Sequence, residues 1–211
     1  MDSSDAADLI AELHEDKAEH EEADRFRNRA ALLIAFLAAL LAIGGLGGGN
    51  ATDEMIFNNI RASDTWAFFQ AKNMRQTAYE IAAAEIEARL ADPGVAPETR
   101  ASLSQRLADY RSTISRYEDE PDADSPGDPL RGEGKKQLRA QAGAFEAARE
   151  HAEMQDASFD MAEVLLQLAL VLGSVAILAV NRPILVLSGL LGLGGAVLTA
   201  NGFLLFAPLP F

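Results

Sequence analysis

Residues 30–49 read AALLIAFLAALLAIGGLGGG and carry no charged side chain. A bilayer core about 30 Å thick is crossed by about 20 apolar helical residues. Two more neutral stretches, residues 164–181 and 183–211, follow late in the chain and are separated only by Arg182. The rest of the chain is too small to bury all three in a water-soluble core. The sequence therefore predicts an all-α integral membrane protein with transmembrane helices at about 30–49, 163–181 and 184–207.

The charges beside these stretches predict an orientation. Arg25, Arg27 and Arg29 precede the first span, and Arg182 lies between the second and third. Basic residues collect on the cytoplasmic side, and three crossings put both groups on that side. We therefore expect a multi-pass inner-membrane protein with a cytoplasmic N-terminus and a periplasmic middle region. A cleaved signal peptide is the alternative for the first span, but the apolar run is long and its leader is acidic.

Composition narrows the functional classes. The 211 residues hold 32 acidic and 18 basic side chains, a formal net charge of −14, with no cysteine and three histidines. Nucleic-acid binding needs clustered Lys and Arg, and the lack of cysteine removes thiolate chemistry. Phosphate loops, nucleophile elbows and HExxH motifs are absent from the sequence. We expect no enzyme activity, no cofactor, no nucleic acid and no small-molecule substrate.

Residues 1–29 form an acidic N-terminal segment that we place in the cytoplasm. Leu9, Ile10 and Leu13 make a narrow apolar edge on a predicted helix. Two readings stay open: a solvated acidic segment, or a helix that docks on a partner.

Residues 50–162 form the predicted extramembrane region. Gly47, Gly48 and Gly49 predict a break after the first span, with Asn50 or Thr52 capping a new helix. This helix ends at Asp92-Pro93-Gly94, a second spans about 97–118, an acidic linker covers 118–134, and a third helix starts near 133. An apolar residue recurs every seven positions in the first of these helices, at Ile60, Ala67, Met74, Ile81 and Ala88.

Such a sevenfold repeat is typical of a coiled-coil seam. The third helix carries its own, with Leu138, Phe145, Ala152 and Phe159. From the helix lengths we expect an antiparallel coiled-coil hairpin whose outer half contains three helices, the linker spanning an offset of roughly 20 Å. Its Ala-rich seam is weak, which favours a homo-oligomer or a partner in a membrane complex.

The segment FNNIRASDTWAFFQAKNMRQ at 57–76, followed by Tyr79-Glu80, resembles an uncharacterised bacterial membrane family, domain-of-unknown-function family 4337. The resemblance extends to the order of parts: charged leader, one span, helical middle, two further spans. It implies a membrane location and no established activity.

The core of that segment holds the candidate interaction residues. Trp and Phe beside Asp, Gln and Lys suit a polar-rimmed protein contact. The alternative is that the aromatic residues fill the hairpin core opposite Phe145 or Phe159. The candidate residues are Ser63, Asp64, Trp66, Phe69, Gln70 and Lys72.

The acidic linker contains a weak metal-site pattern. Asp122, Asp124, Asp128 and Glu133 occupy positions 1, 3, 7 and 12 of a calcium-binding loop, but Pro126 replaces the expected ligand at position 5. A solvated linker is the preferred reading, and no metal is expected.

Small residues recur on the predicted spans and allow close packing in lipid. They are Ala31, Ala35 and Ala39 on the first span, and Ser188, Gly192, Ala196 and Ala200 on the third. Gln167 and Asn201 are predicted to form a hydrogen bond, either as a structural pair or in a transport path.

These features together favour a non-enzymatic, membrane-anchored scaffold or accessory subunit that acts through its helical region. The alternatives are a homo-oligomeric channel or transport element, and a cation-sensing membrane regulator.

Overall fold

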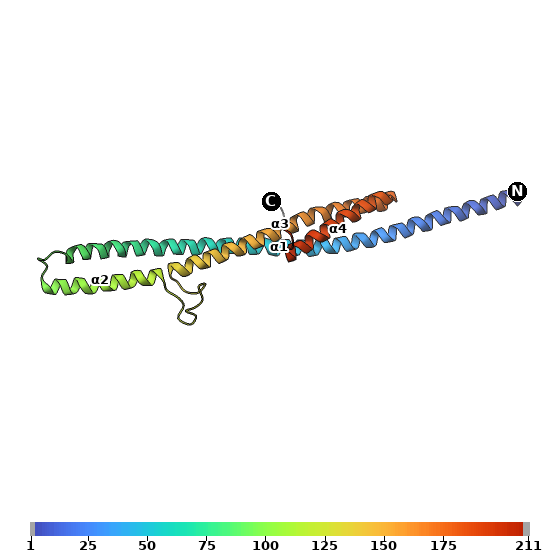
Figure 1. Cartoon of the computed structure of the whole chain (residues 1–211). Coiled ribbons are helices and arrows are strands. Elements are labelled where there is room, and N and C mark those ends of the chain that lie inside the picture. Colours follow the sequence, from blue (N-terminus) through green and yellow to red (C-terminus); the bar gives the residue numbers. More distant parts are fainter. Residues whose placement is uncertain (1–2, 209–211) are drawn as a thin grey trace. The chain divides into compact units, whose positions relative to one another are not determined.

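The structure is a computed structural model that describes residues 3–208, with side chains at Lys17 and from His20 onward. Within that range the chain forms four α-helices and no β-strand (Figure 1). The predicted all-α class is confirmed. The apolar edge at Leu9, Ile10 and Leu13 lies outside the described side chains. The helices are α1 (Ser3–Leu90), α2 (Pro97–Glu118), α3 (Lys135–Ala179) and α4 (Arg182–Leu204).

The chain divides into two compact units. Unit 1 contains Met1–Asp53 and Ala152–Phe211, and unit 2 contains Glu54–His151. Helices α1 and α3 each contribute to both units. Three of the helices in the described part of the chain are long and apolar enough to cross a membrane: α1, α3 and α4.

Unit 1 packs α1, α3 and α4 around small residues. Leu37 of α1 lies fully buried with Leu166 of α3, and a Cβ at Gly192 of α4 would come within 2.4 Å of the Leu37 side chain. Ser188 of α4 donates a 2.6 Å hydrogen bond to the carbonyl oxygen of Ala169 of α3. These contacts bring the helix backbones close together, which is how helices associate in lipid.

The predicted break at Gly47–Gly49 is wrong, because α1 continues to Leu90 without interruption. The glycines serve packing instead. A Cβ on Gly47 would lie 2.6 Å from the ring of Phe159, and one on Gly48 would lie 3.2 Å from its Cβ. Thr52 does not cap a new helix either: its hydroxyl donates to the Asp156 carboxylate at 2.7 Å.

Unit 2 begins with α2 running back along the end of α1. Ala83 and Ile86 of α1 are buried against Leu107 of α2. Tyr79 meets Tyr110 edge-on, with ring centroids 5.2 Å apart. Pro97 opens α2, where the missing N–H of proline costs nothing.

The apolar seam predicted for α1 is wrong in register. Ile60, Met74 and Ile81 are 53%, 70% and 58% exposed. We call Ile60, Ala67, Met74, Ile81 and Ala88 the outer stripe, and every member is exposed. The buried stripe lies two residues away, about 200° around the helix. Its buried members lie seven or fourteen residues apart, and two of them are polar: Ala30, Leu37, Gly44, Ala51, Asn58, Lys72 and Ile86.

The three-helix outer half is also wrong. The last turns of α1 pack against α2, and the part of α1 before them packs against α3, which begins where α2 ends (Figure 1). The linker does not span an offset, because its two ends meet at the same place on α1. Glu120 and Glu133 both contact the Lys72 ammonium group.

Candidate interaction site

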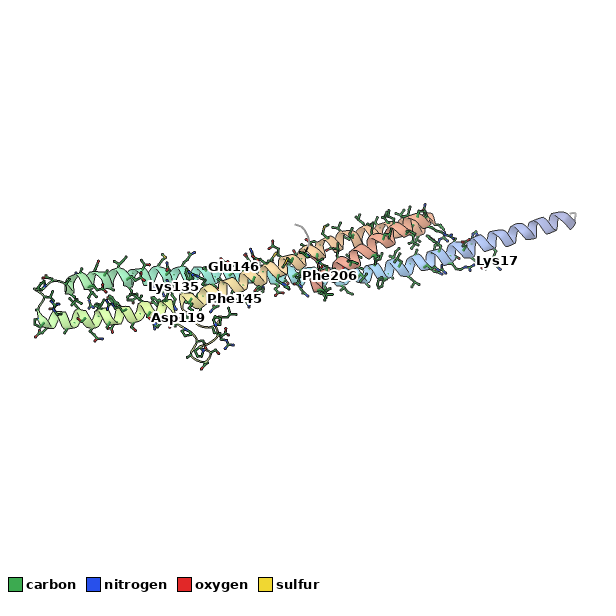
Figure 2. All side chains as sticks on the ribbon, in the orientation of Figure 1. Lys17, Asp119, Lys135, Phe145, Glu146 and Phe206 are labelled. Atoms are coloured by element: carbon green, nitrogen blue, oxygen red, sulfur yellow. The ribbon has the colours of Figure 1, made fainter. Side chains whose placement is uncertain are left out.

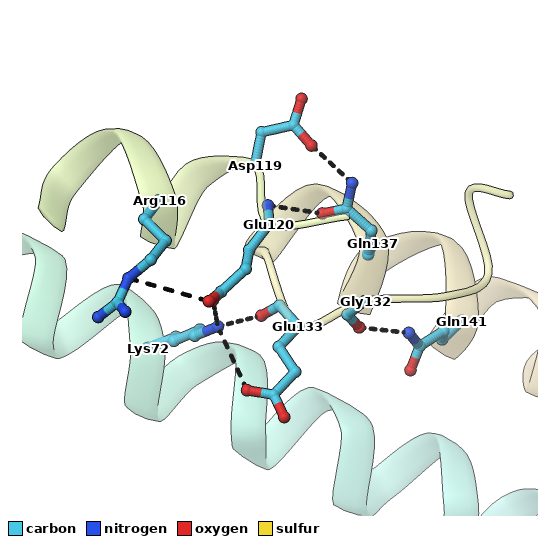
Figure 3. A network of polar contacts seen from close by, with 8 residues as sticks. All are labelled: Lys72, Arg116, Asp119, Glu120, Gly132, Glu133, Gln137 and Gln141. Atoms are coloured by element: carbon cyan, nitrogen blue, oxygen red, sulfur yellow. Dashed lines mark hydrogen bonds and ion pairs between the residues drawn. The ribbon is translucent and has the colours of Figure 1, made fainter. Parts of the chain in front are cut away.

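Lys72 is the centre of the polar network in unit 2 (Figure 3). Its side chain is only 6% exposed, and its Nζ lies 2.7 Å from a carboxylate oxygen of Glu120. The same ammonium group donates to the backbone carbonyl oxygen of Glu133 and lies 3.9 Å from the Glu133 carboxylate. The rings of Phe68 and Tyr117 are each 5.6 Å from it. A buried ammonium group needs such partners, because desolvating an unpaired charge is costly.

This network closes the linker into a loop. The backbone N–H of Glu133 donates to the Glu120 carbonyl oxygen at 2.9 Å, and Pro121 and Gly132 form an isolated β-bridge. Gly132 has φ +113°, and a Cβ there would lie 2.3 Å from the Glu120 carbonyl oxygen, so glycine is required. The acidic segment between these residues is therefore held at both ends by one lysine of α1.

Carboxylates beside the network are stabilised in their charged form. Hydrogen bonds from Lys135 and then Gln76 lower the pKa of Glu118 below its ordinary value of 4.5. Hydrogen bonds from Gln137 and Lys136 lower the pKa of Asp119 below 3.8. Each carboxylate accepts donors from another element, so ionisation favours the closed arrangement.

Trp66 and Ser63 line a shallow pocket between α1 and α3. The indole N–H of Trp66 donates to the Glu146 carboxylate at 2.8 Å, and Figure 2 labels Glu146 next to Phe145 on α3. Arg149 also lines the pocket, and its buried Nε has no hydrogen-bond partner among the described residues. The cavity measures about 220 Å³.

Phe69 extends this aromatic surface along α1. Its ring meets Trp66 edge-on at 5.5 Å, and the cationic groups of Lys135 and Arg139 lie 5.9 Å and 5.5 Å from its centroid. Asp64 and Gln70 are exposed. The six candidate residues therefore do not form one site. Phe145 does lie near this segment, with Arg61 over its ring, whereas Phe159 packs against Phe203 in unit 1.

The carboxylates of Asp122 and Asp128 form local hydrogen bonds within the linker. Asp122 accepts from the backbone N–H groups of Asp124 and Ser125, and Asp128 accepts from that of Leu130. These bonds are the turn-forming contacts typical of Asp. Within the described part of the chain no group of three or more His, Asp or Glu side chains is placed to hold a metal ion.

The predicted pair of Gln167 and Asn201 is wrong. Gln167 donates to Glu163 at 2.8 Å on its own helix. Asn201 donates to the Ser158 hydroxyl and to the Ala207 carbonyl, and accepts from the Ala207 N–H. Asn201 thus fixes the end of α4, and the contacts support neither reading of a Gln167–Asn201 pair, structural or in a transport path.

Within one chain, only part of the small-residue stripes is buried. Ala31, Ala35 and Ala39 are exposed, as is Ala200, while Ala196 is half-buried. Ser188 and Gly192 are buried as expected. The buried face of α4 continues through residues that the four-residue spacing missed, namely Gly195, Thr199 and Gly202.

Sequence reasoning also missed most partners of the network. Glu120, Gln137 and Glu146 carry no local signal that separates them from the many other polar residues of the chain. The glycine at 132 is the exception, because a glycine in an acidic loop suggests a special backbone angle.

These features define the class of protein. It is all-helical in the part that the structure describes, with three helices long and apolar enough to cross a membrane, and its acidic loop is held closed by Lys72. The family model described as "Domain of unknown function (DUF4337)" matches residues 26–205. The chain belongs to that family. No curated protein and no solved structure matches it.

Proposed function

We propose that the protein is a non-enzymatic membrane scaffold whose copies associate through the outer stripe of α1. Three apolar helices anchor it, and unit 2 carries the contact surface. The single observation that carries the proposal is the sevenfold apolar repeat on the exposed face of α1. A water-exposed helix gains nothing from such a repeat, whereas a seam between two helices needs it.

A second copy is the occupant that fits the stripe. Copies inserted with the same topology in one bilayer present α1 in the same direction, so each stripe residue meets its own equivalent. From Ile60 to Ala88 the stripe is about 42 Å long at 1.5 Å per residue. A strip roughly 10 Å wide, the diameter of a helix, would bury about 400 Å² per copy. This is about half of a standard interface, so we expect weak pairing that depends on confinement in the membrane.

Charge gives the pairing a second signature. Glu80 and Glu85 flank the outer stripe, and parallel copies would bring them near each other. Salt screens such repulsion, since the Debye length falls from about 10 Å at 0.1 M to 3 Å at 1 M. Pairing should therefore become stronger as ionic strength rises.

Disulfide crosslinking tests this arrangement directly, because the chain has no cysteine of its own. Met74→Cys and Ile81→Cys, reconstituted in vesicles and oxidised, are expected to give crosslinked dimers. Arg75→Cys and Arg89→Cys are matched controls one residue from stripe positions, and they should stay monomeric. The proposal fails if the stripe variants crosslink no better than these controls at high protein density.

A further inference from the structure

A pocket lined by arginines lies in unit 1, where α1 passes the start of α4. It measures about 760 Å³, within the range of small-molecule sites. Three of its lining residues are arginines, from two different helices, and three are apolar. These six residues are Arg25, Arg29, Arg182, Phe26, Leu185 and Val186.

The charges in this pocket are unbalanced. Among the side chains that the structure describes, Glu22 is the one acidic group that lines it, and it pairs with Arg182. Arg25 donates to the Glu21 backbone carbonyl oxygen at 3.2 Å and lies 3.6 Å from the Glu21 carboxylate, but both side chains are largely exposed. Arg29 has no ion pair with any side chain that the structure describes. Three guanidinium groups against the Glu22 carboxylate, with the exposed Glu21 carboxylate beside Arg25, leave a net cationic site on a chain of net charge −14.

The apolar walls decide between possible anions. Phe26 precedes the apolar run of α1, and Leu185 and Val186 belong to the first turn of α4, so they border the segments suited to lipid. Val186 is 62% exposed. A soluble phosphate has no apolar group that could contact these side chains. A phospholipid has both an acyl chain for the apolar side of the pocket and a phosphate for the arginines.

We propose that this pocket binds the headgroup of an anionic phospholipid from the surrounding bilayer. Guanidinium groups suit the phosphate because they offer planar pairs of N–H donors. Basic pockets between membrane helices are known to hold acidic headgroups. The site is separate from the outer stripe in unit 2, and it rests only on the insertion of the three helices.

Native mass spectrometry of the full chain in detergent gives a test that does not depend on topology. The protein is mixed with equal amounts of phosphatidylglycerol and phosphatidylcholine, and the retained lipids are counted. We expect a preference for phosphatidylglycerol that falls about fivefold for each arginine removed in Arg25→Gln, Arg29→Gln and Arg182→Gln. Arg27→Gln is the matched control, because Arg27 sits in the same turn, pairs with Asp24 and does not line the pocket.

Soluble glycerol phosphate is the competing probe. It should displace the retained phosphatidylglycerol poorly, since it lacks the acyl chain. Equal losses in Arg27→Gln and the pocket variants would overturn the proposal, as would full displacement by glycerol phosphate. Thermal melting gives a second measurement: phosphatidylglycerol should raise the Tm of wild type and Arg27→Gln equally, and that of Arg29→Gln by less. If wild type retained no lipid of either kind, the proposal would be overturned, because the pocket would hold no headgroup.

Discussion

Replacing Lys72 tests whether one buried lysine holds the linker closed. Lys72→Met keeps a long side chain but removes the ammonium group. Glu120 then loses its 2.7 Å partner and keeps only a 3.8 Å contact with Arg116. The Glu133 carbonyl oxygen loses its donor as well. Breaking a buried ion pair costs about 3–5 kcal/mol; since Glu120 is 32% exposed, we expect the lower end of that range, about 3 kcal/mol.

Amide hydrogen exchange at the loop measures this loss of free energy. The backbone N–H of Glu133 is bonded to the Glu120 carbonyl oxygen, so it exchanges when the loop opens. A cost of about 3 kcal/mol should speed that exchange roughly 100-fold. Amides around Ile86 should be unchanged, because their core with α2 remains intact.

Two further variants isolate the ion pair from general damage. Lys136→Met removes an exposed 3.3 Å contact with Asp119, and exposed pairs contribute about 0–1 kcal/mol, so exchange should rise less than about fivefold. Glu120→Gln combined with Lys72→Met should cost less than the sum of the two single changes. If Glu133 remains as protected in Lys72→Met as in wild type, the lysine does not hold the loop.

Three further predictions concern the pH dependence of unit 2, the glycines of α1 and the buried face of α1. Acid should loosen unit 2: the folded pKa of Glu118 is lowered, so its contribution is present above pH 4.5 and lost as pH falls through the folded pKa, and the fluorescence of the single tryptophan should shift there; a signal that stays flat from pH 4.5 downward until the whole chain unfolds contradicts this. Gly47→Ala should lower Tm through overpacking of about 1–3 kcal/mol against the ring it contacts, whereas Gly45→Ala, which meets nothing within 4 Å, should leave Tm equal or higher; equal shifts would refute the packing role. Ile86→Ala should lower the free energy of unfolding measured in urea by about 2–4 kcal/mol, whereas the exposed Ile81→Ala should lower it by less than about 0.5 kcal/mol; similar losses would show that the buried face is misassigned.

Helix ends were predictable because local chemistry decides them. The dipeptide Asp92-Pro93 cannot continue a helix, and α1 ends at Leu90. Pro97 starts α2 at the predicted residue. At the start of α4 the Asn181 side chain accepts from the Ile184 N–H, an N-cap contact that favours a helix start. In each case the signal lies within a few residues of the boundary.

The glycines of α1 were misread because their role depends on distant residues. Glycine destabilises an isolated helix by about 1 kcal/mol relative to alanine, which favoured a break at 47–49. In the folded chain Phe159, more than 100 positions later, fills the space that their missing side chains leave. The low helix propensity of these glycines is outweighed by packing against Phe159, which no neighbouring residue in the sequence indicates.

The register of α1 shows a different limit of sequence reasoning. The apolar residues of α1 recur with a sevenfold period on the outer stripe. The buried face instead carries Asn58, Lys72 and Gln76, which a hydrophobic pattern cannot detect. Such polar groups can be buried when they are paired, as Lys72 is with Glu120.

A polar inner face and an apolar outer face together constrain what α1 can do. Polar residues in a seam cost stability but fix which partner fits, as a buried Asn does in coiled coils. Lys72 accepts only a register that brings Glu120 and Glu133 to it. The outer stripe has no polar member, so nothing in it fixes one register or one partner number. We therefore expect the fold of unit 2 to be unique while association through the stripe stays weak and adjustable. Met74→Asn changes an exposed outer position that the proposed assembly would bury, so it should leave the fold of unit 2 intact and reduce crosslinking through Ile81→Cys.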